Sequence, residues 1–115
     1  MSLDLNCIFC KIIEGLIPAE ILLQDENFVA FNDLNPQAPT HLLFVPTIHV
    51  ENAAELAKIS PVVLGALFKA VGKVAQDRAI TDYRTVFNTG AGAGQSVFHA
   101  HLHLLSGREF DWPPG

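Results

Sequence analysis

Residues 99–105 read HAHLHLL, with a histidine at every second position. Side chains alternate between the two faces of a β-strand, so a strand here would carry three imidazoles on one face and an apolar stripe on the other. A single histidine in a strand is usually a packed or solvated residue, but packing does not explain three in strict alternation. The pattern therefore predicts a strand over 97–105 whose apolar face packs on a helix and whose other face is chemically active.

Three aligned imidazoles suit either a metal site or phosphate chemistry. The preceding segment, residues 88–96 (NTGAGAGQS), is rich in glycine, which lets backbone N–H groups approach an oxyanion, and Gln95 and Ser96 add side-chain donors. Most glycine-rich loops are simple turns, and this one lacks the Gly-Lys-Ser/Thr ending of a P-loop. Beside a row of histidines, however, it favours an anion-binding pocket.

The rest of the 115 residues is typical of one α+β domain. The expected strands cover residues 21–24, 28–32, 41–45, 84–88 and 97–105. We expect a short helix over 7–14, ended by Gly15, and a long amphipathic helix from a cap at Ser60-Pro61 to about Arg78. Strands without βαβ alternation around one long helix predict a mostly antiparallel sheet.

The charge balance narrows the class of partner. Seven Lys and Arg stand against twelve Asp and Glu, a formal net charge of −5, which argues against binding long nucleic acid. A small phosphate ligand is still compatible, because backbone N–H groups and a few histidines can hold one. No apolar run reaches the roughly 18 residues of a membrane span, and the N-terminus lacks the pattern of a secretion signal, so we expect a cytoplasmic protein without membrane contact.

The two cysteines, Cys7 and Cys10, form a C-x-x-C pair. Without a secretion signal such a pair indicates reduced thiols, which serve as metal ligands or as a redox pair, rather than a structural disulfide. Two free buried cysteines are the alternative. A thioredoxin-like role is disfavoured because the surrounding βαβ context is missing.

The histidine run resembles the signature of the histidine triad (HIT) superfamily of nucleotide hydrolases and transferases. The chain also resembles the Hint branch, the histidine triad nucleotide-binding proteins, at residues 31–33 (FND), 36–41 (PQAPTH), Pro46, 94–97 (GQSV) and 112–115 (WPPG). The resemblance spans essentially the whole chain, so we expect a single HIT domain over 1–115. The closing WPPG favours the Hint branch over the diadenosine-polyphosphate hydrolase branch.

This resemblance implies a purine nucleoside phosphoramidate hydrolase of the adenosine 5′-monophosphoramidase type, which forms a nucleotidyl-histidine intermediate and releases a nucleoside monophosphate. Of the implied catalytic residues, His101 is the nucleophile, His103 holds the phosphate oxygens and Ser96 lies near the leaving group. The two remaining catalytic histidines are His99 and His41. No cofactor is expected to be needed for this chemistry.

The resemblance also implies a nucleotide-binding set. Asp33 would hold the ribose hydroxyls, and the phosphate would contact Asn88, Gln95, Ser96, His101 and His103. An apolar slot for the purine would be lined by Ile8, Phe9, Ile12, Phe31 and Leu34, although such residues could equally be ordinary core. The implied partners are purine nucleotides, AMP, GMP and their phosphoramidates.

Cys7 and Cys10 depart from the best-known animal Hint proteins, which lack the pair. Other superfamily members carry it, and the resemblance to them implies a structural zinc ion held by Cys7, Cys10, His49 and His99. Two thiolates and two imidazoles are a sensible tetrahedral set. The implied fold is a five-stranded antiparallel sheet with one long and one short helix, and two chains would pair as a homodimer through the long helix and a neighbouring strand.

Three other functions fit the same residues. The chain could be a nucleotide-binding regulatory protein whose hydrolase activity is incidental. It could instead be a dinucleoside polyphosphate hydrolase or nucleotidyl transferase of the same superfamily, with a phosphate rather than an amine as leaving group. Alternatively, the cysteines and histidines could form a pure metal-binding module.

Overall fold

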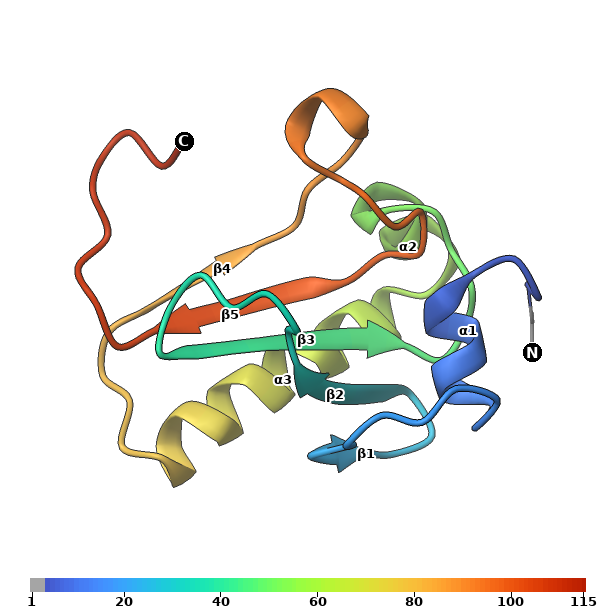
Figure 1. The fold of residues 1–115 in the computed structure, drawn as a ribbon, viewed down its shortest axis with the longest axis horizontal. Helices are drawn as coiled ribbons and strands as arrows, with labels where there is room; N and C mark the ends of the chain where they lie inside the picture. The colour runs from blue at the N-terminus through green and yellow to red at the C-terminus, as the bar shows by residue number, and fades with distance from the viewer. Residues whose placement is uncertain (1–3) are drawn as a thin grey trace.

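The computed structural model describes residues 4–115 and contains a five-stranded antiparallel sheet in the order β1-β2-β3-β5-β4 (Figure 1). The strands are β1 (Leu23–Gln24), β2 (Phe28–Asn32), β3 (Thr40–Pro46), β4 (Tyr83–Val86) and β5 (Leu102–Ser106). The helices are α1 (Ile8–Ile13), α2 (Ala53–Ile59) and α3 (Pro61–Asp77), with a 3-10 turn, η1, at Ala91–Ala93. The expected α+β class and antiparallel sheet are confirmed.

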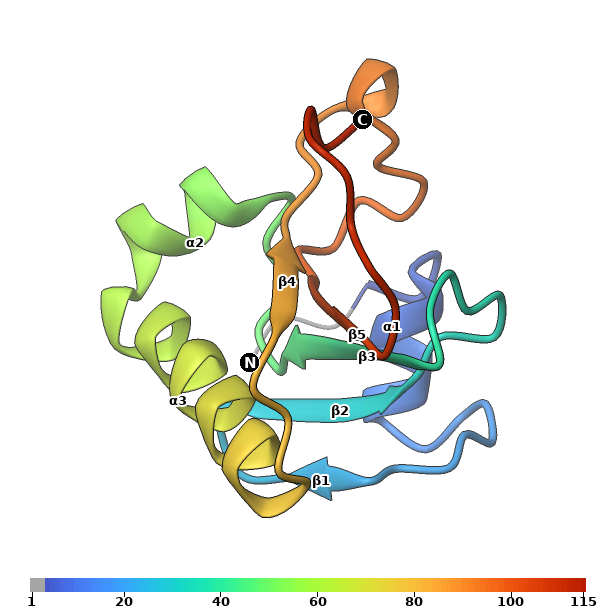
Figure 2. The ribbon, with the colours of Figure 1, turned by 90° about the vertical axis from the view of Figure 1, so that its left-hand side faces the viewer.

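The helices cover opposite faces of the sheet. Figure 2 shows α2 and α3 on one face and α1 on the other. The larger core lies beneath α3 and includes Leu42, Phe44, Leu67, Leu102 and Leu104, whereas the smaller core beneath α1 includes Phe9, Val29, Phe31, Leu43 and Val45. Because successive residues of a strand face opposite ways, β3 contributes to both cores.

The long helix begins where the sequence predicted it. The Ser60 hydroxyl accepts a hydrogen bond from the Val63 N–H at 3.2 Å, and Pro61 occupies the first turn, where its missing N–H costs nothing. The helix ends at Asp77, one residue before the expected end. Its outer surface exposes Val62 and Phe68, and pairing of two chains through this helix stays a prediction.

Helix α2 was not expected, so the prediction of one long and one short helix was incomplete. Its N-cap is Asn52, whose side-chain oxygen accepts a hydrogen bond from the Glu55 N–H at 3.0 Å. A capping residue followed three positions later by Glu is a recognisable helix start. The helix is short and buries only Leu56 completely, so its apolar pattern is weak.

The strand predicted over 97–105 is shorter in the structure. It corresponds to β5, which begins only at Leu102. Phe44 pairs with Leu102, and continuing that register would set Ala100 opposite Pro46. Proline has no N–H for a ladder. The Ala100 N–H donates instead to the Val50 carbonyl at 2.8 Å, so the ladder stops.

The alternation of sides nevertheless continues through residues 99–101. Ala100 belongs to the core beneath α3, while the rings of His99 and His101 both contact Phe9 of α1. Only His103 lies within β5 itself. The three histidines therefore share the α1 face, as the sequence predicted, without sharing one strand.

The outer strands are also shorter than expected. The hairpin of 21–24 with 28–32 forms, but its first strand is only β1, and β4 covers 83–86 rather than 84–88. In the described part of the chain, no helix is long and apolar enough to cross a membrane.

Candidate functional site

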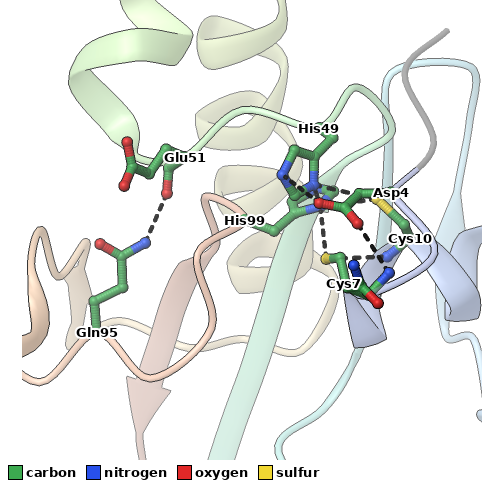
Figure 3. A network of polar contacts seen from close by, with 8 residues as sticks. Asp4, Cys7, Cys10, His49, Glu51, Gln95 and His99 are labelled. Atoms are coloured by element: carbon green, nitrogen blue, oxygen red, sulfur yellow. Dashed lines mark hydrogen bonds and ion pairs between the residues drawn. The ribbon is translucent and has the colours of Figure 1, made fainter.

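Four side chains from three separate segments converge beside α1, and we call them the Cys/His cluster: Cys7, Cys10, His49 and His99. Figure 3 shows them facing a common centre, and their potential ligand atoms all lie within 4.8 Å of one another. The Cys10 Sγ is 3.2 Å from the His49 Nδ1 and 3.5 Å from the His99 Nδ1. The Cys7 Sγ is 3.4 Å from the His99 Nδ1, and the two imidazole Nδ1 atoms are 3.1 Å apart.

Local structure brings the two sulfurs together. Cys7 is the N-cap of α1, and its Sγ accepts a hydrogen bond from the Cys10 N–H at 3.4 Å. The C-x-x-C spacing thus places both thiols on the first turn of one helix. His49 follows β3 and His99 precedes β5, so the central strands of the sheet bring the imidazoles to the same place.

These separations fit a tetrahedral zinc ion. With Zn–S near 2.3 Å and Zn–N near 2.0–2.1 Å, ligand atoms in a tetrahedron lie about 3.3 to 3.8 Å apart. The outer ring nitrogens are oriented accordingly: the His99 Nε2–H donates to the Pro46 carbonyl at 2.8 Å, and the His49 Nε2 lies 3.8 Å from the Asp4 carboxylate. With these outer contacts, both Nδ1 atoms lie on the side of the cysteine sulfurs, where a metal ion would be bound.

The charges of the cluster also suit a cation. Burial lowers the pKa of His99 to about 4, so this imidazole is neutral, and burial raises the pKa of the Cys10 thiol. A divalent metal ion supplies the positive charge that stabilises cysteine as thiolate. The residues present therefore fit zinc in both geometry and chemistry.

A second group, which we call the imidazole chain, consists of His41, His103 and His101. The Gln37 N–H donates to the His41 Nδ1 at 3.0 Å, so the neutral His41 ring carries its proton on Nε2. Burial lowers the pKa of His41, although the nearby Asp33 carboxylate raises it partly. The His41 Nε2–H then lies 2.9 Å from the His103 Nδ1 and 3.4 Å from the Asp33 carboxylate.

This chain of hydrogen bonds fixes the proton of His103. Because His103 accepts at Nδ1, its own proton is on Nε2. The Nε2 atom is buried and has no hydrogen-bond partner among the described residues, and burial lowers the pKa of His103 to about 4. A buried donor without an acceptor is costly, so a ligand oxygen at this place would be stabilised.

His101 presents the opposite chemistry. Its Nδ1 lies 2.8 Å from the backbone carbonyl of His99, which can only accept, so Nδ1 carries the proton and Nε2 has a free lone pair. Burial lowers the pKa of His101, which favours the neutral ring. The His101 and His103 rings are 5.0 Å apart between centroids. A lone pair and a donor are thus placed side by side.

A cavity of about 220 Å³ opens onto these two rings. It brings together most of the residues singled out from the sequence, namely Ile8, Phe9, Ile12, Phe31, Asp33, Leu34, Ser96, His101 and His103. Phe9 and Phe31 also belong to the core beneath α1, whereas the Leu34 side chain is fully exposed at the rim. The apolar slot is therefore partly core and partly open surface.

Gln95 and Asn88 lie outside this cavity. The Gln95 Oε1 accepts from the Gly90 N–H at 2.9 Å, and its Nε2 donates to the Glu51 carbonyl at 2.7 Å (Figure 3) and the Val97 carbonyl at 3.1 Å. With both amide hydrogens used, the Gln95 side chain holds the glycine-rich loop in place and has no donor left for a phosphate. A phosphate contact of Gln95 would have to replace one of these hydrogen bonds, and the expected contact stays a prediction.

Asn88 lies next to Gly94, which has a φ of +92°, and its expected phosphate contact stays a prediction. A Cβ at Gly94 would lie 3.7 Å from the Asn88 Nδ2, so the two residues are in van der Waals reach. Gly94 lines the cavity, whereas Asn88 is not among its lining residues.

Sequence reasoning missed Gln37 and Asp4, which contact His41 and His49 respectively. The Gln37 contact is made by its backbone N–H, and no side-chain pattern reports a backbone donor. Asp4 precedes Cys7 by three residues, and a carboxylate beside a C-x-x-C pair was the available signal.

Comparison with known proteins gives consistent results. The family model described as the scavenger mRNA decapping enzyme C-terminal binding domain matches residues 6–110. The chain is 45% identical to a HIT-like protein of Synechococcus elongatus over 111 residues, covering 96% of this chain and 97% of the relative. It is 43% identical to the 14 kDa zinc-binding protein of Zea mays, covering 97% of this chain and 90% of the relative.

Among solved structures, a HIT family hydrolase from Legionella pneumophila superposes with a TM-score of 0.90 at 45% identity, covering 96% of this chain and all of that one (100%). The match in sequence, in fold and over nearly the whole length confirms the resemblance drawn from the histidine run. The chain therefore belongs to the histidine triad family.

Proposed function

We propose that this protein hydrolyses purine nucleoside phosphoramidates through a nucleotide covalently attached to His101, and that it belongs to the Hint branch. One observation carries the proposal. His101, with an Nε2 lone pair, and His103, with an Nε2–H, both line one cavity. A nucleophile and an unsatisfied donor side by side suit attack on phosphorus with stabilisation of the phosphoryl oxygens. The hydrolase name of the Legionella relative supports the same class.

In the first step the His101 Nε2 attacks the α-phosphorus, an N–P bond forms, and the P–N bond to the leaving amine breaks. The leaving nitrogen takes up a proton from water, directly or through the hydroxyl of Ser96, which lines the cavity and regains its own proton from that water. The His101 Nδ1–H keeps its bond to the His99 carbonyl, so the attached imidazole is cationic and is itself a good leaving group.

In the second step water attacks the same phosphorus and the bond to His101 breaks. One water hydrogen is released to solvent, the hydroxyl oxygen becomes part of the nucleoside monophosphate, and His101 regains its Nε2 lone pair. In both steps the His103 Nε2–H stabilises negative charge on a phosphoryl oxygen. Because this donor is fixed before the substrate binds, it needs no reorganisation during the reaction.

The nucleoside would occupy the apolar end of the cavity. Asp33 offers a carboxylate to the ribose hydroxyls, and it is already oriented because its Oδ1 accepts from the Asn35 N–H at 2.9 Å. The flat walls of Phe9, Phe31 and the neighbouring aliphatic residues suit a purine. AMP, GMP and their phosphoramidates are the ligands that we expect.

We further propose that zinc is structural in this protein. Held by the Cys/His cluster, it would supply fixed positive charge and tie the first turn of α1 to His49 and His99. The maize relative that is named a zinc-binding protein supports this assignment. The catalytic steps above use only protein groups and water, so we assign the zinc no part in them.

The deciding experiment is intact-mass spectrometry of protein quenched with acetonitrile and base during turnover of adenosine 5′-phosphoramidate. We expect the protein to gain the mass of one AMP group, on a peptide containing His101. A matched His101→Asn variant should show no added mass. Turnover without any adduct in the unmodified protein, or the same adduct in the variant, would contradict the mechanism.

A further inference from the structure

The loop before β3, residues 35–39, controls the proton on His41. Its central residue, Gln37, donates its N–H to the His41 Nδ1, which leaves the His41 proton on Nε2. In turn, the His103 proton is on its buried, unpartnered Nε2, and His103 lines the cavity. A contact that fixes the Gln37 backbone therefore also keeps the His103 proton on Nε2.

Arg108 holds this backbone from outside the cavity. Its Nε donates to the Gln37 carbonyl at 2.8 Å. We propose that Arg108 is a positioning residue, which maintains the proton arrangement of His41 and His103 by fixing Gln37. The inference deepens the proposed function, on which its kinetic part rests.

The arginine is itself held in place although it is exposed. One of its terminal nitrogens donates to the Glu109 carbonyl at 2.9 Å, and the guanidinium carbon lies 4.3 Å from the centre of the Phe110 ring. A cation over an aromatic face and a backbone acceptor together restrict the rotamer. Arg108 can thus hold Gln37 without being buried.

A second contact joins the same two segments. Gly107, directly before the arginine, has a φ of +97°, and a Cβ there would lie 2.8 Å from the Cβ of Pro39. Only glycine permits this close approach. The turn after β5 therefore packs directly on the 35–39 loop, in agreement with a fixed distance between Arg108 and Gln37.

The chemical consequence follows from the two neutral forms of imidazole. If Gln37 can rotate, the His41 Nδ1 loses its donor, and the forms protonated at Nδ1 and at Nε2 become closer in free energy. In the Nδ1 form, His41 would accept at Nε2 from the His103 Nδ1. His103 would then present a lone pair, rather than a proton, to the phosphate oxygen. Such molecules would be inactive.

The test compares Arg108→Gln with Arg84→Gln. Arg84 also lies over the Phe110 ring, at 5.1 Å from its centre, and donates to the Asp111 carbonyl, but no hydrogen bond in the described part of the chain joins it to Gln37. This variant therefore disturbs the same C-terminal segment and leaves the proposed connection intact. Arg108→Lys keeps a charged donor and serves as the conservative variant.

The first readout needs no substrate. Long-range ¹H–¹⁵N correlation spectra of the ligand-free, zinc-loaded protein report which ring nitrogen of His41 is protonated. We expect a single Nε2–H form in the unmodified protein and in Arg84→Gln, a mixture of both forms in Arg108→Gln, and partial recovery in Arg108→Lys. An unchanged His41 pattern in Arg108→Gln, or an equal change in Arg84→Gln, overturns the inference.

The second readout is kinetic. With adenosine 5′-phosphoramidate, we expect kcat of Arg108→Gln to fall roughly three- to tenfold, with KM within twofold, the effect of one solvent-exposed hydrogen bond. A loss confined to KM would overturn the positioning role. If the unmodified protein does not turn over this substrate while the His41 pattern still shifts, the proposed function fails and the inference stands.

Discussion

The Cys/His cluster and the imidazole chain divide all five histidines of the sequence between them, on the same face of the same sheet. In the cluster, the Nδ1 atoms of His49 and His99 lie 3.2 to 3.5 Å from the cysteine sulfurs, and their outer nitrogens lie near the Asp4 carboxylate and the Pro46 carbonyl. In the chain, His101 and His103 line a cavity and have their Nδ1 atoms in hydrogen bonds. The partner of the other ring nitrogen thus decides whether an imidazole is suited to a closed metal site or to an open reactive one.

His99 connects the two regions, because its side chain belongs to the cluster while its backbone carbonyl fixes the proton of His101. The Asp33, His41 and His103 donor atoms also lie close enough together to hold a metal. The Gln37 N–H and the His41 proton occupy that group with hydrogen bonds, and it contains no sulfur. The comparison therefore predicts one zinc per chain, bound by the Cys/His cluster. Each experiment below tests whether metal binding belongs to this cluster and ligand chemistry to the imidazole chain.

The largest effect is expected at the open site. His101→Asn removes the nucleophile and keeps a polar side chain, so kcat on adenosine 5′-phosphoramidate should fall by roughly 10³-fold or more. The dissociation constant for AMP, measured by calorimetry, should change only a few-fold, because the cavity walls remain. Retained full turnover would assign the chemistry elsewhere.

The next largest effect separates the two regions by metal content. Cys10→Ser should lower bound zinc from about one equivalent to below about 0.2 and lower the melting temperature by several degrees, because metal binding stabilises the folded state. The matched variant His41→Gln should retain its zinc. Elemental analysis and thermal unfolding measure both quantities, and equal zinc loss in the two variants would contradict the division.

Asp33→Asn tests whether the carboxylate belongs to the ligand cavity. Removing its charge should weaken AMP binding by about tenfold, the typical effect of a lost hydrogen bond to a charged group, and should reduce the preference for AMP over 2′-deoxy-AMP. Zinc content should stay the same. A variant with unchanged affinity for both nucleotides would exclude the ribose contact.

The smallest effect concerns pH. His103 has a folded pKa near 4 against an ordinary 6.5, so between these values the unfolded chain binds a proton that the folded chain does not. The free energy of unfolding should therefore fall as pH drops from about 6.5 to about 4, by at most about 1.4 kcal/mol per unit from this group. His103→Gln should show a shallower decline in denaturant titrations, and an unaltered slope would argue against a buried neutral His103.

Much of the fold follows from local patterns. The Ser60-Pro61 cap, the apolar periodicity of α3 and the alternation of 99–105 correctly predict a long helix and a two-faced histidine segment. The length of β5 and the existence of α2 were not predicted. The ladder ends because Pro46 stands opposite in the paired strand, and pairing across 50 residues is not readable from a window of sequence.

The sequence by itself determined the chemical inventory: three alternating histidines, a C-x-x-C pair and a glycine-rich loop. Only the tertiary structure decided how each group is used. Gln95 holds a loop because three backbone groups reach its amide. Arg108 contacts the Gln37 carbonyl, and the Gln37 N–H contacts His41. Backbone donors and acceptors are the same at every position of a chain, so their effect on a proton depends on which segments the fold brings together.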